Sequence, residues 1–226
     1  MKQIVKNAEP NSLLQHRASQ FANFDNIPLA TKEELRQNLL SEQGHICCCC
    51  MKRIPEHTSP YMKVEHFKCQ SKPENSHLIL DYKNLFGACT GNKGQPKIKE
   101  TCDAKKGNAD LTINPTSTLP ICETLFKYNS EGEISSIAGN ADINRQLNEV
   151  LNLNMQTLKE GRSEIYLDVQ ERVRLESKKT KKDKTSFVKF LEQEKAKWLE
   201  RLDNKYRPYC SVAIYYLTKK IKSNQN

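Results

Sequence analysis

Four consecutive cysteines, Cys47 to Cys50, constrain this chain more than any other feature of its sequence. On a strand, adjacent side chains point to opposite faces, so four cysteines in a row would not converge on one ion. Neighbouring cysteines also rarely meet the geometry that a disulfide requires. The pair best suited to bind a metal is therefore Cys47 and Cys50, which a turn separates. This C-x2-C pair requires a second pair elsewhere in the chain.

The second pair is Cys89 and Cys102, which are separated by twelve residues. Together the two pairs supply four thiolates, the ligand set that a structural tetrahedral zinc ion prefers. A zinc ion would stabilise the small core that we expect for residues 46–110. The alternative is that these cysteines are buried free thiols, which protein cores tolerate well.

The rest of the composition indicates where such a protein works. The chain has no run of eighteen apolar residues, and its first residues, MKQIVKNAEP, lack the apolar stretch of a signal peptide. We therefore expect a cytoplasmic protein with no membrane contact. In that compartment the nine cysteines are expected to be thiols or metal ligands rather than a disulfide framework.

Residue patterns predict a mixed α+β chain in three regions. Residues 1–45 form a helical segment, residues 46–115 hold the cysteines among short elements, and residues 116–226 form a basic, mostly helical region. Within the middle region, YMKVEHF predicts a short strand, DYKNLFGAC a turn that leads into a helix, and CDAKKGN one more helical turn. The lysine-rich segment 177–185 predicts a linker between two later helices.

Four polar residues among the cysteines suit metal-assisted phosphodiester hydrolysis. His66 can take a proton from water and so act as a general base. Glu65 and Asp103 are hard oxygen donors, which suit Mg2+ or Mn2+, and such an ion can stabilise the leaving oxygen and the charge on the phosphate. Asn84 can hydrogen-bond the backbone or the imidazole and so hold His66 in place. These four side chains form the predicted catalytic set.

The order of these motifs resembles an HNH endonuclease with a ββα-metal fold and a structural zinc ion. More narrowly, the stretches MKQIVKNAEPNSL, LRQNLLSEQGHICCCC, VEHFKCQS and DYKNLFGACTGNKG resemble PtuB, the HNH component of Septu and retron-linked antiphage systems. The resemblance runs from residue 1 to about residue 115. This chain departs from the family pattern at Asp103, where the motif usually ends in histidine, and at Cys69, where the family usually has proline. Cys48 and Cys49 stand where the family usually has one aromatic residue within its Cys-x-x-Cys pair.

The resemblance implies a zinc-stabilised ββα-metal nuclease core, embedded in a mostly helical chain, with a catalytic Mg2+ or Mn2+ on Glu65 and Asp103. It also implies that the protein cuts invading phage DNA as the effector of a defence complex with an ABC/SMC-like ATPase similar to PtuA. A tRNA-cleaving effector of a retron-linked system would use the same catalytic residues. A zinc-held module that binds nucleic acid or a partner without cutting would need only the cysteines.

Positive charge is concentrated in the last third of the chain. Residues 155–226 hold 18 Lys and Arg against 10 Asp and Glu. This excess favours a polyanionic partner such as nucleic acid, although a solvated helical surface fits the charge equally well. The family resemblance favours docking of the ATPase here, with Trp198 and Tyr215 as apolar anchors. Nearer the cysteines, Lys105 and Lys106 are the predicted phosphate contacts, although two lysines on a solvated turn fit the sequence equally well.

Overall fold

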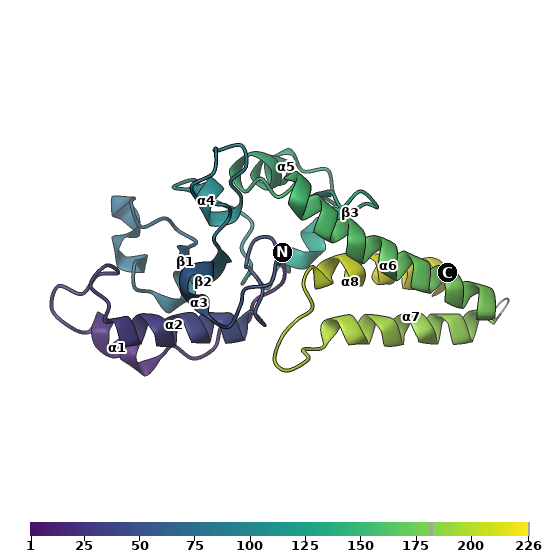
Figure 1. Cartoon of the computed structure of the whole chain (residues 1–226), viewed down its shortest axis with the longest axis horizontal. Coiled ribbons are helices and arrows are strands. Elements are labelled where there is room, and N and C mark those ends of the chain that lie inside the picture. Colours follow the sequence, from purple (N-terminus) through teal and green to yellow (C-terminus); the bar gives the residue numbers. More distant parts are fainter. Residues whose placement is uncertain (181–182, 226) are drawn as a thin grey trace.

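A computed structural model describes residues 1–180 and 183–225 of the chain. Short helices and two small sheets make up the first two thirds, and three longer helices extend from them at one end (Figure 1). The first elements are α1 (Asn11–Arg17), α2 (Leu29–Glu42), α3 (Thr58–Tyr61), β1 (Met62–His66), η1 (Pro73–Leu78), η2 (Tyr82–Asn84), β2 (Leu85–Cys89) and α4 (Cys102–Lys106). They are followed by η3 (Cys122–Leu125), β3 (Phe126–Tyr128), β4 (Ile134–Ser136), α5 (Ala141–Arg145), η4 (Gln146–Val150), α6 (Gln156–Thr180), α7 (Lys184–Leu199) and α8 (Cys210–Gln225).

The first sheet is an antiparallel hairpin of β1 and β2 that packs against the end of α2. The Gln43 side chain donates to the carbonyl oxygen of Gly87 (2.8 Å) and accepts from its backbone N–H (2.7 Å). A Cβ on Gly87 would lie 2.6 Å from Met62 Cε, so the end of the Met62 side chain would have to move to admit one. The strand predicted for YMKVEHF is confirmed. The helix expected from DYKNLFGAC is wrong, because residues 85–89 form β2.

α2 supplies much of the core beneath this hairpin. Leu35, Leu39 and Leu40 are fully buried on one face of the helix, as an amphipathic helix requires. Gly44 follows the helix with φ of +59°, a conformation that glycine adopts without steric cost. A Cβ there would lie 2.4 Å from the ring of Tyr206, so the same glycine also lets a distant part of the chain approach closely.

The second sheet is the hairpin of β3 and β4, whose turn rests on α6. A Cβ on Gly132 in this turn would lie 1.9 Å from the carbonyl oxygen of Lys159. Arg162 of α6 is 1% exposed and donates to the carbonyl oxygens of Gly132 (2.6 Å) and Leu153 (2.7 Å). The hairpin and the start of α6 are therefore packed backbone to backbone, with a guanidinium group buried between them.

The helices α6, α7 and α8 form the C-terminal end of the molecule (Figure 1). Helix α6 continues to Thr180, so the first part of the linker predicted for residues 177–185 is helical. Residues 181 and 182 of that predicted linker lie outside the described residues. Within the described ranges, no helix combines the length and the apolar character that crossing a membrane requires.

The two aromatic residues predicted as docking anchors belong to the internal packing. Trp198 is 4% exposed, and the guanidinium carbon of Arg207 lies 5.0 Å from the centre of its ring. Tyr215 is half-buried and meets the ring of Tyr128 edge to face, with 5.7 Å between the ring centres. The burial of Trp198 therefore argues against its predicted role as a docking anchor.

The segment between α7 and α8 returns to the N-terminal part of the chain. The backbone N–H of Tyr206 donates to Gly44 O (2.9 Å), and that of Tyr209 donates to Met51 O (3.2 Å). Since Met51 directly follows the cysteine run, these bonds connect the C-terminal helices to the cysteines. The three predicted regions are thus in contact, and the boundaries between them stay a prediction.

Candidate active site and metal centre

The cysteines of the two predicted pairs come together in the fold. The Sγ atoms of Cys47, Cys50, Cys89 and Cys102 all lie within 4.8 Å of one another. The Cys47–Cys102 separation is 3.9 Å, and Cys89 Sγ lies 3.8 Å from both Cys50 Sγ and Cys102 Sγ. A tetrahedral zinc ion with Zn–S bonds of about 2.3 Å needs sulfur–sulfur separations of about 3.8 Å. The cluster therefore has the donor type and the spacing that a zinc ion requires.

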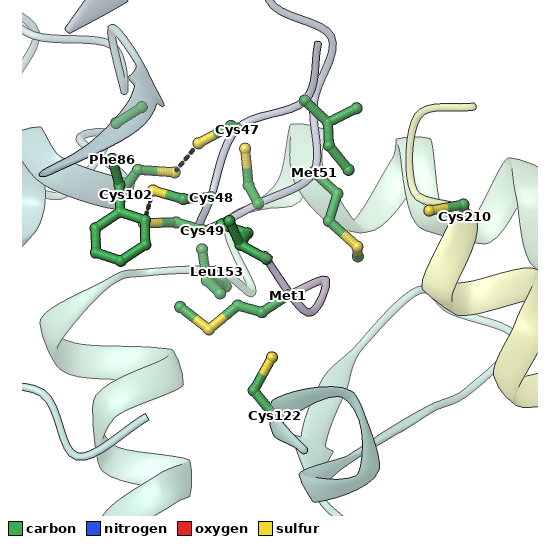
Figure 2. Close-up of a cluster of buried hydrophobic side chains, with 14 of the residues drawn as sticks. Met1, Cys47, Cys48, Cys49, Met51, Phe86, Cys102, Cys122, Leu153 and Cys210 are labelled. Carbon is green, nitrogen blue, oxygen red and sulfur yellow. Dashed lines mark hydrogen bonds between the residues drawn. The ribbon is translucent and has the colours of Figure 1, made fainter. Parts of the chain in front are cut away.

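The cysteine run is a turn and not a strand. Met51 N donates to Cys47 O (3.0 Å), and Met51 itself adopts φ of +65°. Because the chain reverses here, the sulfur atoms of Cys48 and Cys49 lie 3.6 Å apart and within 4.8 Å of Cys47 Sγ (Figure 2). The expectation that adjacent thiols diverge is therefore wrong for this segment, since that expectation assumed an extended chain.

A buried positive charge lies near the thiol cluster. Arg162 forms no salt bridge within the described part of the chain, and its hydrogen bonds go to two carbonyl oxygens and to Asn154 Oδ1. Burial lowers the pKa of Arg162, whereas negative charge on Cys50 or Cys102 would raise it. A buried charge is costly without an opposite charge nearby. Zinc bound to four thiolates carries two net negative charges, so it would supply the partner that Arg162 lacks.

His66, at the end of β1, is held in one orientation. Its Nε2 lies 3.0 Å from the carbonyl oxygen of Ile79. A carbonyl oxygen can only accept, so Nε2 carries the proton and Nδ1 keeps a free lone pair. The Phe24 ring packs against the imidazole edge to face, with 4.7 Å between the ring centres. Burial lowers the pKa of His66, which favours the neutral imidazole that a general base requires.

Asn84 acts on His66 through the backbone. Its side chain accepts from Lys68 N (2.7 Å) and donates to the carbonyl oxygens of Lys68 (3.0 Å) and Leu78 (3.1 Å). These bonds close the loop between β1 and β2 at both of its ends. Because Leu78 directly precedes Ile79, Asn84 fixes the carbonyl group that orients His66. The sequence left open whether Asn84 bonds the backbone or the imidazole. In the structure its hydrogen bonds go to backbone groups.

Glu65 and Asp103 form a carboxylate pair beside His66. Glu65 is 6% exposed, and Lys106 Nζ lies 2.5 Å from its Oε1. Lys63 Nζ lies 3.8 Å from Asp103 Oδ2. Burial and the neighbouring Asp103 carboxylate raise the pKa of Glu65 to about 9. Burial and the neighbouring carboxylate thus favour the protonated form of Glu65, and the Lys106 ammonium opposes this effect.

The two carboxyl groups of Glu65 and Asp103 are suitable ligands for a divalent cation. Metal ligands must be deprotonated, so a bound cation would favour the ionised form of Glu65, whose pKa is raised in its absence. Mg2+ is commonly held by one or two carboxylates together with substrate phosphates. Among the described residues, the only groups of three or more metal-ligating side chains are the thiol clusters, so Glu65 and Asp103 would bind such an ion as a pair.

The two lysines predicted to contact phosphate have different surroundings. Lys106 has a side chain that is 1% exposed, and it donates to the carbonyl oxygen of His66 (3.0 Å) as well as pairing with Glu65. It is therefore an internal cation of the site, and its prediction as a phosphate contact is wrong in this structure. Lys105 is half-buried and donates to Lys97 O (3.1 Å).

Three further groups at the site were not predicted from the sequence. Lys63 lies two residues before Glu65 on β1, and the two-residue period of a strand could have placed it on the same face. Phe24 and the carbonyl group of Ile79 reach His66 only through the tertiary fold. No local pattern indicates either contact.

Comparison with known proteins supports the same chemistry. The chain is similar to a protein of Escherichia coli named "Retron Ec83 putative HNH endonuclease", with 28% identity over 122 residues. The similarity supports an HNH endonuclease. The match covers 48% of this chain and 46% of the relative, so the chain spans about half the length of the relative it matches. No protein-family model matches the chain.

Proposed function

We propose that this chain is a metal-dependent HNH endonuclease in which β1, β2 and α4 form a ββα-metal core. The observation that carries the proposal is the orientation of His66, whose Nε2 is engaged by Ile79 O while Nδ1 is free, with a pKa that burial lowers. It lies beside two carboxyl groups, Glu65 and Asp103, and burial and the Asp103 carboxylate raise the pKa of Glu65 to about 9. The similarity to an HNH endonuclease supports the same class of reaction.

In the proposed reaction, His66 accepts a proton from an attacking water at Nδ1. The hydrogen bond from Nε2 to Ile79 O sets the tautomer, and the Phe24 ring limits rotation of the imidazole. Glu65 and Asp103 would hold a divalent cation, which would supply stabilisation of the leaving oxygen and of the charge on the phosphate. Lys106 keeps Glu65 in position through their ion pair.

The thiol cluster has a structural role in this proposal. Cys89 ends β2 and Cys102 begins α4, directly before Asp103. A zinc ion bound to both cysteines would fix α4 against the hairpin. It would therefore hold Asp103 beside Glu65 in spite of the long loop that separates the strand from the helix.

For the biological role, we propose that the enzyme cuts invading phage DNA in complex with an ABC/SMC-like ATPase. The resemblance to the PtuB family supports this role, and the relative's name links that protein to a retron. The alternative substrate is tRNA, which the same catalytic residues would cleave. The packing of Trp198 and Tyr215 within the chain leaves other parts of the basic helices as the surface for the ATPase.

The test is cleavage by the purified, zinc-loaded chain. Plasmid, linear DNA and total tRNA are each incubated with Mg2+ or Mn2+, with and without the neighbouring ATPase. We expect cleavage of at least one substrate, and only with a divalent ion present. Cleavage of tRNA alone would favour the retron-type effector. Absence of cleavage under every condition, with zinc bound and nucleic acid retained, would favour the non-catalytic binding module.

A further inference from the structure

Two buried thiols beside the zinc-type cluster have no role in the function proposed above. Cys48 is 6% exposed and Cys49 is 3% exposed. Their sulfur atoms lie 3.6 Å apart, and both lie within 4.8 Å of Cys47 Sγ (Figure 2). A zinc ion bound to the four predicted cysteines would form one bond to Cys47 Sγ. A thiolate sulfur can bridge two metal ions, so Cys47 could also bind a second ion. The turn therefore presents a second group of three sulfur donors that shares one member with the first.

The surroundings of these thiols favour a bare ion over a hydrated one. A cavity of about 10 Å³ adjoins Cys48 and Cys49, and its wall is mostly apolar, with Phe86 and Ile113 on it. That volume is at the lower limit for one water molecule. Glu65 is the only carboxyl group on the cavity wall. An ion bound here would thus have sulfur as its main donor and little room for water.

We propose that Cys47, Cys48 and Cys49 form a second metal site for a soft monovalent ion, Cu(I), next to the four-cysteine zinc site. Zinc in a structural site takes four ligands, whereas Cu(I) is stable with three thiolates, and soft sulfur donors select it. On binding, Cys48 and Cys49 each release a proton and form a bond to the ion, while Cys47 bridges to zinc. No electron is transferred in this step.

The charge of such a site is compensated nearby. Two new thiolates and one monovalent cation add a single negative charge to the cluster. Lys6 lies within electrostatic range of Cys48, and Arg162 lies within range of Cys50 and Cys102. Arg162 has no carboxylate partner among the described residues, so additional negative charge in the cluster stabilises it.

The test uses the zinc-loaded chain under anaerobic conditions, titrated with Cu(I) against a chromogenic Cu(I) chelator. We expect one Cu(I) to bind per chain with zinc retained. The variant Cys48→Ser/Cys49→Ser should retain zinc and bind Cu(I) at least about 100-fold more weakly. Cys122→Ser is the control, because Cys122 is equally buried but outside both clusters, and it should behave as the wild type does.

X-ray absorption at the copper edge of the wild-type protein provides a second readout that does not depend on the folding of any variant. Three sulfur neighbours and a nearby zinc atom would support the proposal. Four sulfur neighbours with loss of zinc would show simple replacement at the first site and would overturn it. Equal Cu(I) binding by wild type and the double variant, or no binding in competition with the chelator, would overturn it as well. In that case Cys48 and Cys49 act only as thiols packed against the zinc ligands.

Discussion

At the scale of single residues, one carbonyl group decides which nitrogen of His66 is available. The sequence identifies His66 as a base because a carboxylate precedes it and an asparagine follows, but it does not identify the nitrogen. That choice depends on Ile79 O, which the fold brings to Nε2. The sequence also could not show that Lys106 is buried. A lysine that follows a predicted metal ligand is expected on the surface, whereas the fold places Lys106 inside, paired with Glu65.

The first prediction concerns Asn84. Replacing it with alanine removes three hydrogen bonds and leaves the backbone N–H of Lys68 without its partner. We expect a loss of about 1–3 kcal/mol in the free energy of unfolding, measured by urea denaturation. Cleavage should fall as well, because Ile79 O is no longer fixed.

The matched control for this prediction is Asn11→Ala. Asn11 is exposed at the start of α1 and its side chain makes no hydrogen bond within the described residues, so its loss should change neither stability nor cleavage appreciably. Equal effects of the two substitutions would show that Asn84 does not position the active site.

The second prediction concerns the zinc ligands. Cys89→Ser should abolish stoichiometric zinc binding and lower the melting temperature, because structural zinc contributes directly to folding free energy. Cys69→Ser is the control, since Cys69 is also buried but bonds Ser71 outside the cluster. Metal analysis of both purified variants checks the outcome. Full zinc content in Cys89→Ser would contradict the predicted ligand set.

At the scale of elements, the sequence predicted β1 and the turn of α4 correctly, but β2 incorrectly. Short apolar runs such as LFGAC are ambiguous between helix and strand. The strand forms here because Gln43, far away in the sequence, satisfies the backbone of Gly87. The linker predicted from charge was also wrong in part. Lysine is a good helix former, so a run of lysines need not end α6.

The third prediction concerns the β3–β4 hairpin. Gly132→Ala should destabilise the protein more than Gly139→Ala, although both glycines have positive φ, +75° and +70°. A Cβ on Gly132 meets the backbone of α6, whereas one on Gly139 meets nothing within 4 Å. The strained φ costs each variant about 1–2 kcal/mol, and overpacking should cost Gly132→Ala about 1–3 kcal/mol more. Denaturant unfolding of both variants tests this, and equal losses would contradict the packing of the hairpin on α6.

At the scale of the whole molecule, the C-terminal helices are connected to the metal centre. The sequence indicated a separate basic region because its charge and helical pattern change near residue 155. It could not show that Tyr206 packs on Gly44 or that Tyr209 bonds the residue after the cysteine run, because both contacts span most of the chain.

The fourth prediction follows from this connection. Tyr206→Ala removes a ring that contacts Gly44 and lies 4.5 Å from the guanidinium carbon of Arg201. We expect a loss of about 2–4 kcal/mol in the free energy of unfolding. Tyr61→Ala is the control, because Tyr61 is 53% exposed and should cost less than about 0.5 kcal/mol. Equal stability of Tyr206→Ala and wild type would show that the two ends of the molecule are not coupled.

The measurement that tests the central claim most directly is the cleavage rate of His66→Ala beside that of His77→Ala. Both variants are assayed with zinc bound and Mg2+ or Mn2+ present, on the substrate that the wild type cuts. Removal of the general base should lower the rate of His66→Ala by at least about 100-fold, with zinc content close to that of wild type and a lower melting temperature, since His66 is buried against Phe24. His77 is exposed and outside the site, so His77→Ala should cut normally. Cleavage by His66→Ala at the wild-type rate would contradict the proposed active site.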